Sequence, residues 1–279
     1  MLSADGYRAA VKAGGYINAL DGGANNNFMD EMLQTGYTQN HRVSFGGGTA
    51  ETNFRASLGV IDQKGIIKNN SMRNYTAKID GSQLFFDNKL KLDMGVFGSK
   101  KESRYVNDYQ KTFYSAASFN PTLPATQKED GTWYEDPNAN EVDNPLGRLT
   151  INDREENAYL ATNGRLTWTI NDHLNVSAFG SYTYNSRENM NYIPSTIKAG
   201  IREGRGMAYK GLSRSDVLMG NISLNYKKMF TNSRLDALAL VEGQSYRYSG
   251  TGTHARGFDT NFFGFDNLAA GAIVKYGDV

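Results

Sequence analysis

The fold class follows from the stretch Leu174-Asn175-Val176-Ser177-Ala178-Phe179-Gly180-Ser181-Tyr182-Thr183-Tyr184. Every second residue from Leu174 onward is apolar, small or aromatic, and all intervening residues except Phe179 are Asn, Ser or Thr. A period of two places successive side chains on opposite faces of a β-strand. The stretch therefore predicts a strand with one apolar face and one polar face.

Similar strand-like segments recur along the chain from about Asn40. They cover residues 41–45, 53–60, 74–80, 90–99, 160–170, 216–226 and 234–248. With the first stretch they predict eight strands of about 8 to 12 residues, and ~9 to 11 tilted residues suffice to cross a hydrocarbon layer. The orientation of 234–248 stays open, because Leu238 and Leu240 share parity with Glu242 and Gln244.

The links between these strands alternate in length. Short links at 46–51, 81–88, 171–172 and 228–233 alternate with long ones at 63–72, 101–155 and 187–214. We interpret Gly46-Gly47-Gly48 as part of the first turn. Short turns at one end and long loops at the other are typical of outer-membrane barrels. Strand periodicity by itself fits a soluble β-sandwich or soluble barrel equally well.

Aromatic residues favour the membrane alternative. They stand near strand ends on the apolar parity, where amphipathic rings would lie at the level of the lipid headgroups. The residues concerned are Phe45, Phe54, Tyr75, Trp168, Tyr182, Tyr184 and Tyr226. Mid-strand charges such as Arg55 and Asp93 decide little, because bulk water and a polar lumen both accept them.

Composition excludes several other classes of protein. The 279 residues carry a formal net charge of +1, so no global field would attract nucleic acid. Cysteine is absent, which excludes disulfides, thiolate metal sites and cysteine nucleophiles. No apolar run approaches the ~20 residues of a spanning helix. The first twelve residues lack the features of a signal peptide, so we expect either a cytoplasmic protein or an incomplete chain.

The first 37 residues differ from the rest. Ser3 is placed to cap a short helix that runs to Ala13 and ends at Gly14 and Gly15. A second helical turn is predicted at 28–34, before the first strand. These elements are too small to bury a core of their own, so we interpret 1–37 as a loop insertion and 38–279 as the strand-rich part.

No catalytic or metal-binding constellation is present in the sequence. The three histidines are scattered, no nucleophile or phosphate-binding motif occurs, and adjacent acids such as Glu155 and Glu156 point to opposite sides of a strand. We expect no enzyme activity, no metal and no cofactor. Binding is more plausible, because the loop 101–155 carries aromatic residues among polar ones. The candidate ligand-binding residues are Tyr109, Tyr114, Trp133 and Tyr134, although packing of the loop explains such rings as well.

Several segments together resemble a known family. They are Leu2-Ser3-Ala4-Asp5-Gly6-Tyr7-Arg8, 40–48, 52–60, 65–69, Asn120-Pro121-Thr122-Leu123-Pro124, 130–134 and Asn144-Pro145-Leu146. Their order and spacing resemble the early barrel of SusC/RagA-type TonB-dependent outer-membrane transporters of Bacteroidetes. The resemblance implies an all-β, antiparallel, up-and-down transmembrane segment of about eight strands from a 22-stranded barrel. Its long loops would be extracellular and its short turns periplasmic.

The resemblance also implies a function and partners. Such a transporter imports oligosaccharide or peptide across the outer membrane, with a SusD-like lipoprotein outside and the TonB complex acting through a plug. No plug or TonB box is found in this sequence, so we expect a barrel fragment whose signal peptide is missing through truncation. Two alternatives stay open: a soluble or surface carbohydrate-binding all-β domain, and a closed, autonomous eight-stranded membrane barrel.

Overall fold

The structure is a computed structural model that describes residues 2–16 and 19–277. One antiparallel sheet holds nine strands, and each strand pairs with its neighbour in sequence. The strands are β1 (Tyr37–Gly48), β2 (Thr52–Lys64), β3 (Ser71–Phe85), β4 (Leu90–Tyr105), β5 (Asn152–Asn171), β6 (Leu174–Ile193), β7 (Met207–Met229), β8 (Arg234–Phe258) and β9 (Gly271–Gly277). The sheet is open, because β1 lies at one edge and β9 at the other. The closed eight-stranded barrel is therefore not what this chain forms.

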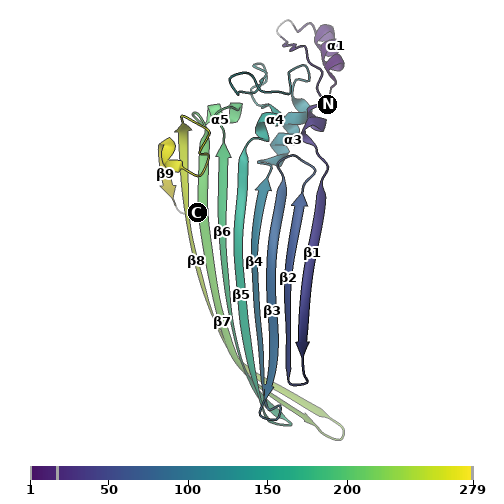
Figure 1. Cartoon of the computed structure of the whole chain (residues 1–279), viewed down its shortest axis with the longest axis vertical. Coiled ribbons are helices and arrows are strands. Elements are labelled where there is room, and N and C mark those ends of the chain that lie inside the picture. Colours follow the sequence, from purple (N-terminus) through teal and green to yellow (C-terminus); the bar gives the residue numbers. More distant parts are fainter. Residues whose placement is uncertain (1, 17–18, 278–279) are drawn as a thin grey trace.

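The alternation of link lengths is confirmed. Tight turns join β1 to β2, β3 to β4, β5 to β6 and β7 to β8 at one end of the sheet, and every longer loop lies at the other end (Figure 1). The first turn lies three residues later than predicted, because Gly46–Gly48 still pair with β2. A Cβ on Gly48 would clash with the Thr52 carbonyl oxygen, so this close approach of the two strands requires glycine.

The prediction of strand length and number was partly wrong. β5 and β6 have 20 residues each, β7 has 23 and β8 has 25, all well beyond the predicted range. The added residues lie at the loop end, where polar and charged side chains occupy both faces and hide the period of two. A ninth strand, β9, was also missed, because its Ala272-Ile273-Val274 run does not alternate.

Cross-strand register defines two faces of the sheet, since directly opposed residues in an antiparallel pair share a face. Phe45, Ala56, Ile79 and Val96 form one row across β1–β4, on what we call the apolar face. The register also settles the orientation of β8. Val241 lies opposite Ile222 on the apolar face. Glu242 lies opposite Asn221 on the polar face, and Leu238, Leu240 and Gln244 share that face with it.

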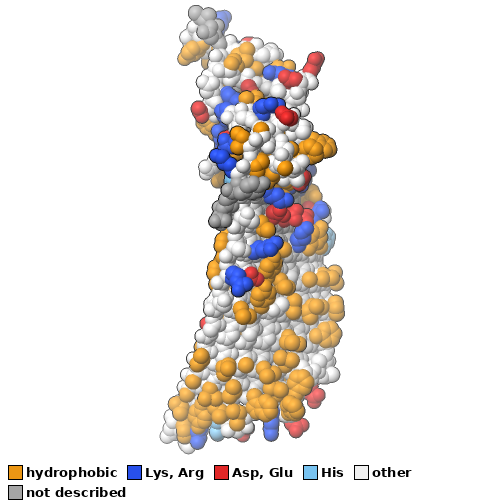
Figure 2. Space-filling model, turned by 90° about the vertical axis from the view of Figure 1, so that its left-hand side faces the viewer, with side chains coloured by type: hydrophobic (Ala, Val, Ile, Leu, Met, Phe, Trp, Pro, Cys, Tyr) orange, Lys and Arg blue, Asp and Glu red, His pale blue; other side chains and the backbone are white. Residues whose placement is uncertain are grey.

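The apolar face is exposed from the tight turns up to the row that contains Val43, Leu58 and Leu160. Ile222 is 63% exposed and Val241 is 78% exposed, and in the described residues no second layer covers them. Hydrophobic side chains gather over the lower half of the side shown in Figure 2, with charged residues above them and at the lower rim. A soluble sandwich would need to bury such a surface, whereas a lipid bilayer covers it. No helix among the described residues is long and apolar enough to cross a membrane.

Short helices accompany the loop end of the sheet. α1 (Ala4–Gly14) begins as predicted, with Ser3 Oγ accepting from the Gly6 amide at 3.1 Å, and Gly15 ends it in the left-handed conformation. α2 (Phe28–Met32) confirms the second predicted helical turn. The remaining elements are α3 (Tyr109–Ser118), α4 (Pro145–Arg148), α5 (Lys198–Arg202) and the 3₁₀ turn η1 (Leu268–Ala270).

Candidate ligand-binding loops

The buried core of the molecule lies mainly among the loops above the sheet. One cluster joins α2, the 65–70 loop and the long loop between β4 and β5; its members are Phe28, Met32, Ile67, Ala116, Phe119, Leu123 and Leu149. The rings of Phe28 and Phe119 meet edge to face with centroids 4.9 Å apart. The first 37 residues therefore do not bury a core alone. They share one with residues 106–151, which fixes these loops as one layer.

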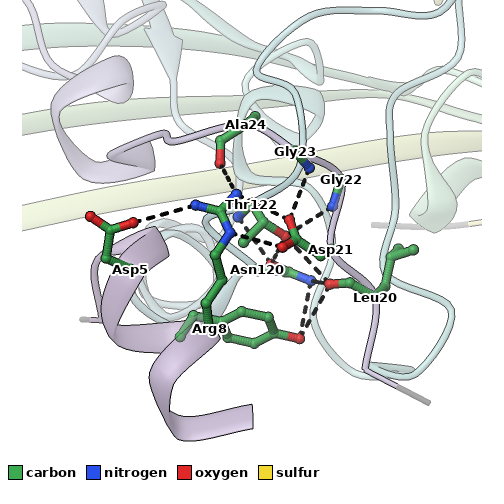
Figure 3. Close-up of polar contacts among 10 residues, drawn as sticks. Asp5, Arg8, Leu20, Asp21, Gly22, Gly23, Ala24, Asn120 and Thr122 are labelled. Carbon is green, nitrogen blue, oxygen red and sulfur yellow. Dashed lines mark hydrogen bonds and ion pairs between the residues drawn. The ribbon is translucent and has the colours of Figure 1, made fainter. Parts of the chain in front are cut away.

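A hydrogen-bond network ties residues 20–26 to residues 120–123 (Figure 3). The buried Asn120 donates from Nδ2 to the Leu20 carbonyl at 2.8 Å and accepts from the Thr122 hydroxyl at 2.7 Å. The Thr122 carbonyl accepts from the Ala24 amide at 2.8 Å. Arg8 also holds residues 20–26, which we call the strap. Its Nε and Nη2 donate to the two Asp21 carboxylate oxygens at 2.8 and 3.1 Å. This bidentate pair lowers the pKa of Asp21 to about 2.

A buried carboxylate joins three loop helices. Asp143 is 1% exposed and lies 3.1 Å from Arg148 of α4, 2.9 Å from Arg202 of α5 and 3.9 Å from Lys111 of α3. The Arg148 Nε also donates to the Thr112 hydroxyl at 3.0 Å. Removing one partner of a buried, hydrogen-bonded ion pair is strongly destabilising. Asp143 therefore holds the two long loops together at the level of α5.

Glu135 is a half-buried acid in the same layer. Its Oε2 accepts from the Asn144 amide at 2.9 Å, whereas Oε1 is buried without a partner among the described residues. Burial raises its pKa to about 7, with a smaller contribution from the nearby Asp143 charge. Glu135 is therefore an acid that titrates near neutral pH. Residue order alone gave no signal for Glu135, Asp143 or Asn120, since their burial depends on contacts between distant loops.

Two of the predicted binding residues, Tyr109 and Tyr114, lie exposed on α3. Each is 59% exposed, at the loop end of the molecule. Five helical residues turn through roughly 500°, so the two rings point about 140° apart and do not form one clamp. Either ring is free to stack on a ligand by itself.

The structure places Trp133 and Tyr134 differently. Tyr134 packs against the Phe28 cluster, and the Lys128 ammonium lies 5.4 Å from the centre of its ring. Trp133 lies against Gly147 of α4, and its indole Nε1 is buried without a partner among the described residues. The four predicted residues are thus not brought together. Their role in binding stays a prediction.

Comparison with known proteins finds two curated proteins of similar sequence. The chain is 25% identical over 284 residues to TonB-dependent receptor P3 of Formosa agariphila, which covers 98% of this chain and 28% of that receptor. It is 30% identical over 160 residues to TonB-dependent receptor SusC of Bacteroides thetaiotaomicron, covering 54% of this chain and 16% of that receptor. The chain thus resembles TonB-dependent receptors, SusC among them. No protein-family model matches the sequence.

Solved structures of this receptor type share the fold. The RagAB peptide transporter matches with a TM-score of 0.72 at 16% identity, over 95% of this chain and 31% of that chain. The RagAB peptide importer in its 'closed-closed' state gives 0.70 at 16% identity, over 91% and 30%. The chain thus spans less than a third of the length of each of these relatives. The resemblance to an antiparallel segment of such a barrel is confirmed.

Proposed function

We propose that this chain forms part of the barrel wall of an outer-membrane, TonB-dependent nutrient importer. The observation that carries the proposal is the exposed apolar face of an antiparallel meander whose long loops all lie at one end. From Leu90 to Gly98, this face of β4 spans eight residue steps, or roughly 26 Å along the strand. At a tilt of ~40° this stretch rises roughly 20 Å along the membrane normal, close to the apolar band of about 25 Å in outer-membrane barrels. The relatives' names, TonB-dependent receptors, support the same function.

The two ends of the sheet would then lie on opposite sides of the membrane. The tight turns face the periplasm, and the loop layer with α1 to α5 faces the outside. Residues 1–37 belong to that outer layer, and 38–279 supply the strands together with the loops between them. The outer layer is where a nutrient would first meet the protein, with the exposed Tyr109 and Tyr114 as candidate stacking residues.

We infer the substrate class and the partners from the resemblance to these relatives. The substrate is an oligosaccharide or a peptide; the RagAB structures are titled as those of a peptide importer and support the second class. A SusD-like lipoprotein would capture the substrate outside, and the TonB complex would supply energy through a plug. We propose binding and transport, not catalysis, as the role of this chain.

Gene disruption in the native host tests the proposal. Cells with the gene intact, disrupted or restored are supplied with fluorescent peptides or fluorescent oligosaccharides, and uptake is measured for each class. We expect uptake of one class to require the gene, and the protein to fractionate with the outer membrane. A folded protein in the soluble fraction would support the carbohydrate-binding alternative. Equal uptake with and without the gene would exclude import of the substrates tested.

A further inference from the structure

Two rows of charged residues cross the sheet just above the apolar band, on the apolar face. The lower row contains Asp62, Arg73, Glu102 and Glu156, which oppose one another from β2 to β5. The upper row, two residues further along, contains Lys64, Ser71, Arg104 and Arg154. All share the parity of the apolar residues below them. Both rows therefore project to the side that faces lipid under the proposed function.

The charges of the lower row pair with one another or with Lys100. Arg73 Nε donates to Asp62 at 3.0 Å. Lys100 lies 2.8 Å from Glu102 and 3.6 Å from Glu156. Each carboxylate in this row has a cation beside it. The lower row thus has no positive charge to spare for a ligand.

The upper row is different. Arg104 and Arg154 stand directly opposite each other on β4 and β5, and like charges in that position repel. In the described part of the chain, neither guanidinium lies within 4.0 Å of a carboxylate, and the same holds for Lys64. Arg154 donates to the Asn152 side chain at 2.8 Å and lies 5.7 Å from the Phe265 ring, both neutral groups. Because the two arginines repel each other and have no counter-charge, an anion bound between them would be stabilised.

These side chains line a hollow of about 600 Å³. Its charged lining consists of the cations Lys64, Arg73, Arg104 and Arg154 and the carboxylates Asp62, Glu102, Glu155 and Glu156, and the neutral Gln34, Asn69, Asn70 and Ser71 add amide and hydroxyl groups. Each of the four carboxylates has a Lys or Arg nitrogen within 4.0 Å, whereas Arg104 and Arg154 have no carboxylate partner among the described residues. The roof is held by the loops, since Gln34 Nε2 donates to the Gly65 and Ile67 carbonyls and Asn69 Nδ2 to the Leu149 carbonyl. Paired guanidinium groups with neutral donors nearby match the oxygens of a phosphate.

The height of the hollow indicates the source of the anion. The row at the top of the apolar band contains Val60 and Tyr75 together with Lys100, and the Arg104 row lies four residues beyond it. At ~3.3 Å per residue and a tilt of ~40°, that is roughly 10 Å along the membrane normal. Long arginine side chains at this height reach the lipid headgroups. The roof above the hollow consists of loops that the proposed function places outside the cell.

We propose that Arg104 and Arg154 bind the phosphate group of a lipid headgroup in the outer leaflet of the outer membrane. The site rests on the proposed function, because the membrane supplies the ligand. Lys64 adds a third positive charge, and Ser71 and Asn70 add neutral donors. The bound headgroup would neutralise the arginine pair and seal the rim of the barrel where the loops meet the lipid.

Lipid retention by the receptor tests this site. The full receptor is purified from outer membranes in mild detergent, once unmodified and once with both R104Q and R154Q. The phosphorylated glycolipid that each protein retains is counted by native mass spectrometry. We expect retention to fall by roughly tenfold or more relative to the unmodified receptor. The matched control is K89Q with K228Q, which removes two charges at the turn end and should leave retention unchanged. Glycolipid whose phosphates have been removed enzymatically should bind the unmodified receptor as weakly as native glycolipid binds the double variant.

Other outcomes overturn the assignment. Equal retention by the double variant and the unmodified receptor would exclude the arginine pair as a lipid site, while import by the same receptor would leave the proposed function standing. Displacement of the glycolipid by millimolar inorganic phosphate would show that the site takes a soluble anion. A receptor absent from the outer membrane would defeat the proposed function and, with it, a lipid ligand. Heat-dependent gel mobility confirms in each case that the variant is folded.

Discussion

Asn120 and Leu20 are 100 residues apart in the sequence and are joined by a hydrogen bond of 2.8 Å from the Asn120 amide to the Leu20 carbonyl. The same Asn120 Nδ2 lies 3.2 Å from an Asp136 carboxylate oxygen and 3.3 Å from the Tyr7 hydroxyl. One buried side chain thus connects the first helix, the strap that follows it and two turns of the long loop. The order of the outer loop layer depends on this residue.

The substitution Asn120→Asp should loosen that layer. It removes the amide donors and places a carboxylate beside Asp136, at a cost of about 1–3 kcal/mol to local stability. We expect the 19–27 segment to be cut several times faster by added protease in outer-membrane vesicles, with the strands unaffected. Asn140→Asp is the matched control, because its exposed side chain should tolerate the change. Equal cutting of both variants would show that the strap is held by other contacts.

Glu135 should make the loop layer sensitive to pH. Its folded pKa of about 7 lies above the ordinary value of 4.5, so the folded state binds the proton more tightly than the unfolded state. Local stability should therefore fall as pH rises from about 4.5 to about 7, and should be lowest above pH 7. Hydrogen exchange of residues 133–144, corrected for intrinsic rates, should show more protection at pH 5 than at pH 8.

Glu135→Gln separates this acid from others that titrate. The amide is neutral at every pH, so the protection of 133–144 should lose most of its dependence on pH. Glu141→Gln changes the same charge on an exposed side chain nearby and should leave that dependence intact. If the Glu135 variant keeps the full dependence, another group controls the loop.

The extent to which the sequence predicts this fold depends on where one face of a strand is apolar. Across the apolar band, the period of two predicted all eight long strands, and the predicted alternation of short turns and long loops was correct. Above the band that signal disappears. β5, for example, begins with Asn152-Asp153-Arg154-Glu155-Glu156, which carries no apolar residue although residues 153–156 all pair with β4. The orientation of β8 needed the register, because Leu238 and Leu240 lie on the polar parity.

Two substitutions at adjacent residues test whether lipid covers the apolar band. Ile222→Arg puts a charge on the exposed apolar face and should destabilise the protein in the membrane by roughly 2–4 kcal/mol near the midplane, less toward the interface. The amount of heat-modifiable protein in the outer membrane should fall. Asn221→Arg introduces the same side chain one residue away on the polar face and should change little. An equal loss for both variants would mean that lipid does not cover the Ile222 face.

The candidate binding residues were harder to predict than the strands. Aromatic composition drew attention to the long loop, but the sequence does not say which rings pack and which remain exposed. Tyr134 packs because the loop folds back on α2, a contact between segments about 100 residues apart. Arg104 and Arg154 gave no signal, since only the register places them side by side.

Tyrosine substitutions distinguish packing from binding within the long loop. Tyr109→Ala and Tyr114→Ala remove exposed rings, so they should leave the resistance of the loop layer to protease unchanged. If either ring stacks on the substrate, its loss should weaken binding by about 1 kcal/mol, or roughly fivefold in Kd, measured by titration of the purified receptor with the imported peptide or oligosaccharide. Tyr134→Ala is the counterpart: it opens a cavity beside Phe28 and should cost about 2 kcal/mol of local stability, seen as faster proteolysis. Unchanged affinity in both exposed variants would move the binding site away from α3.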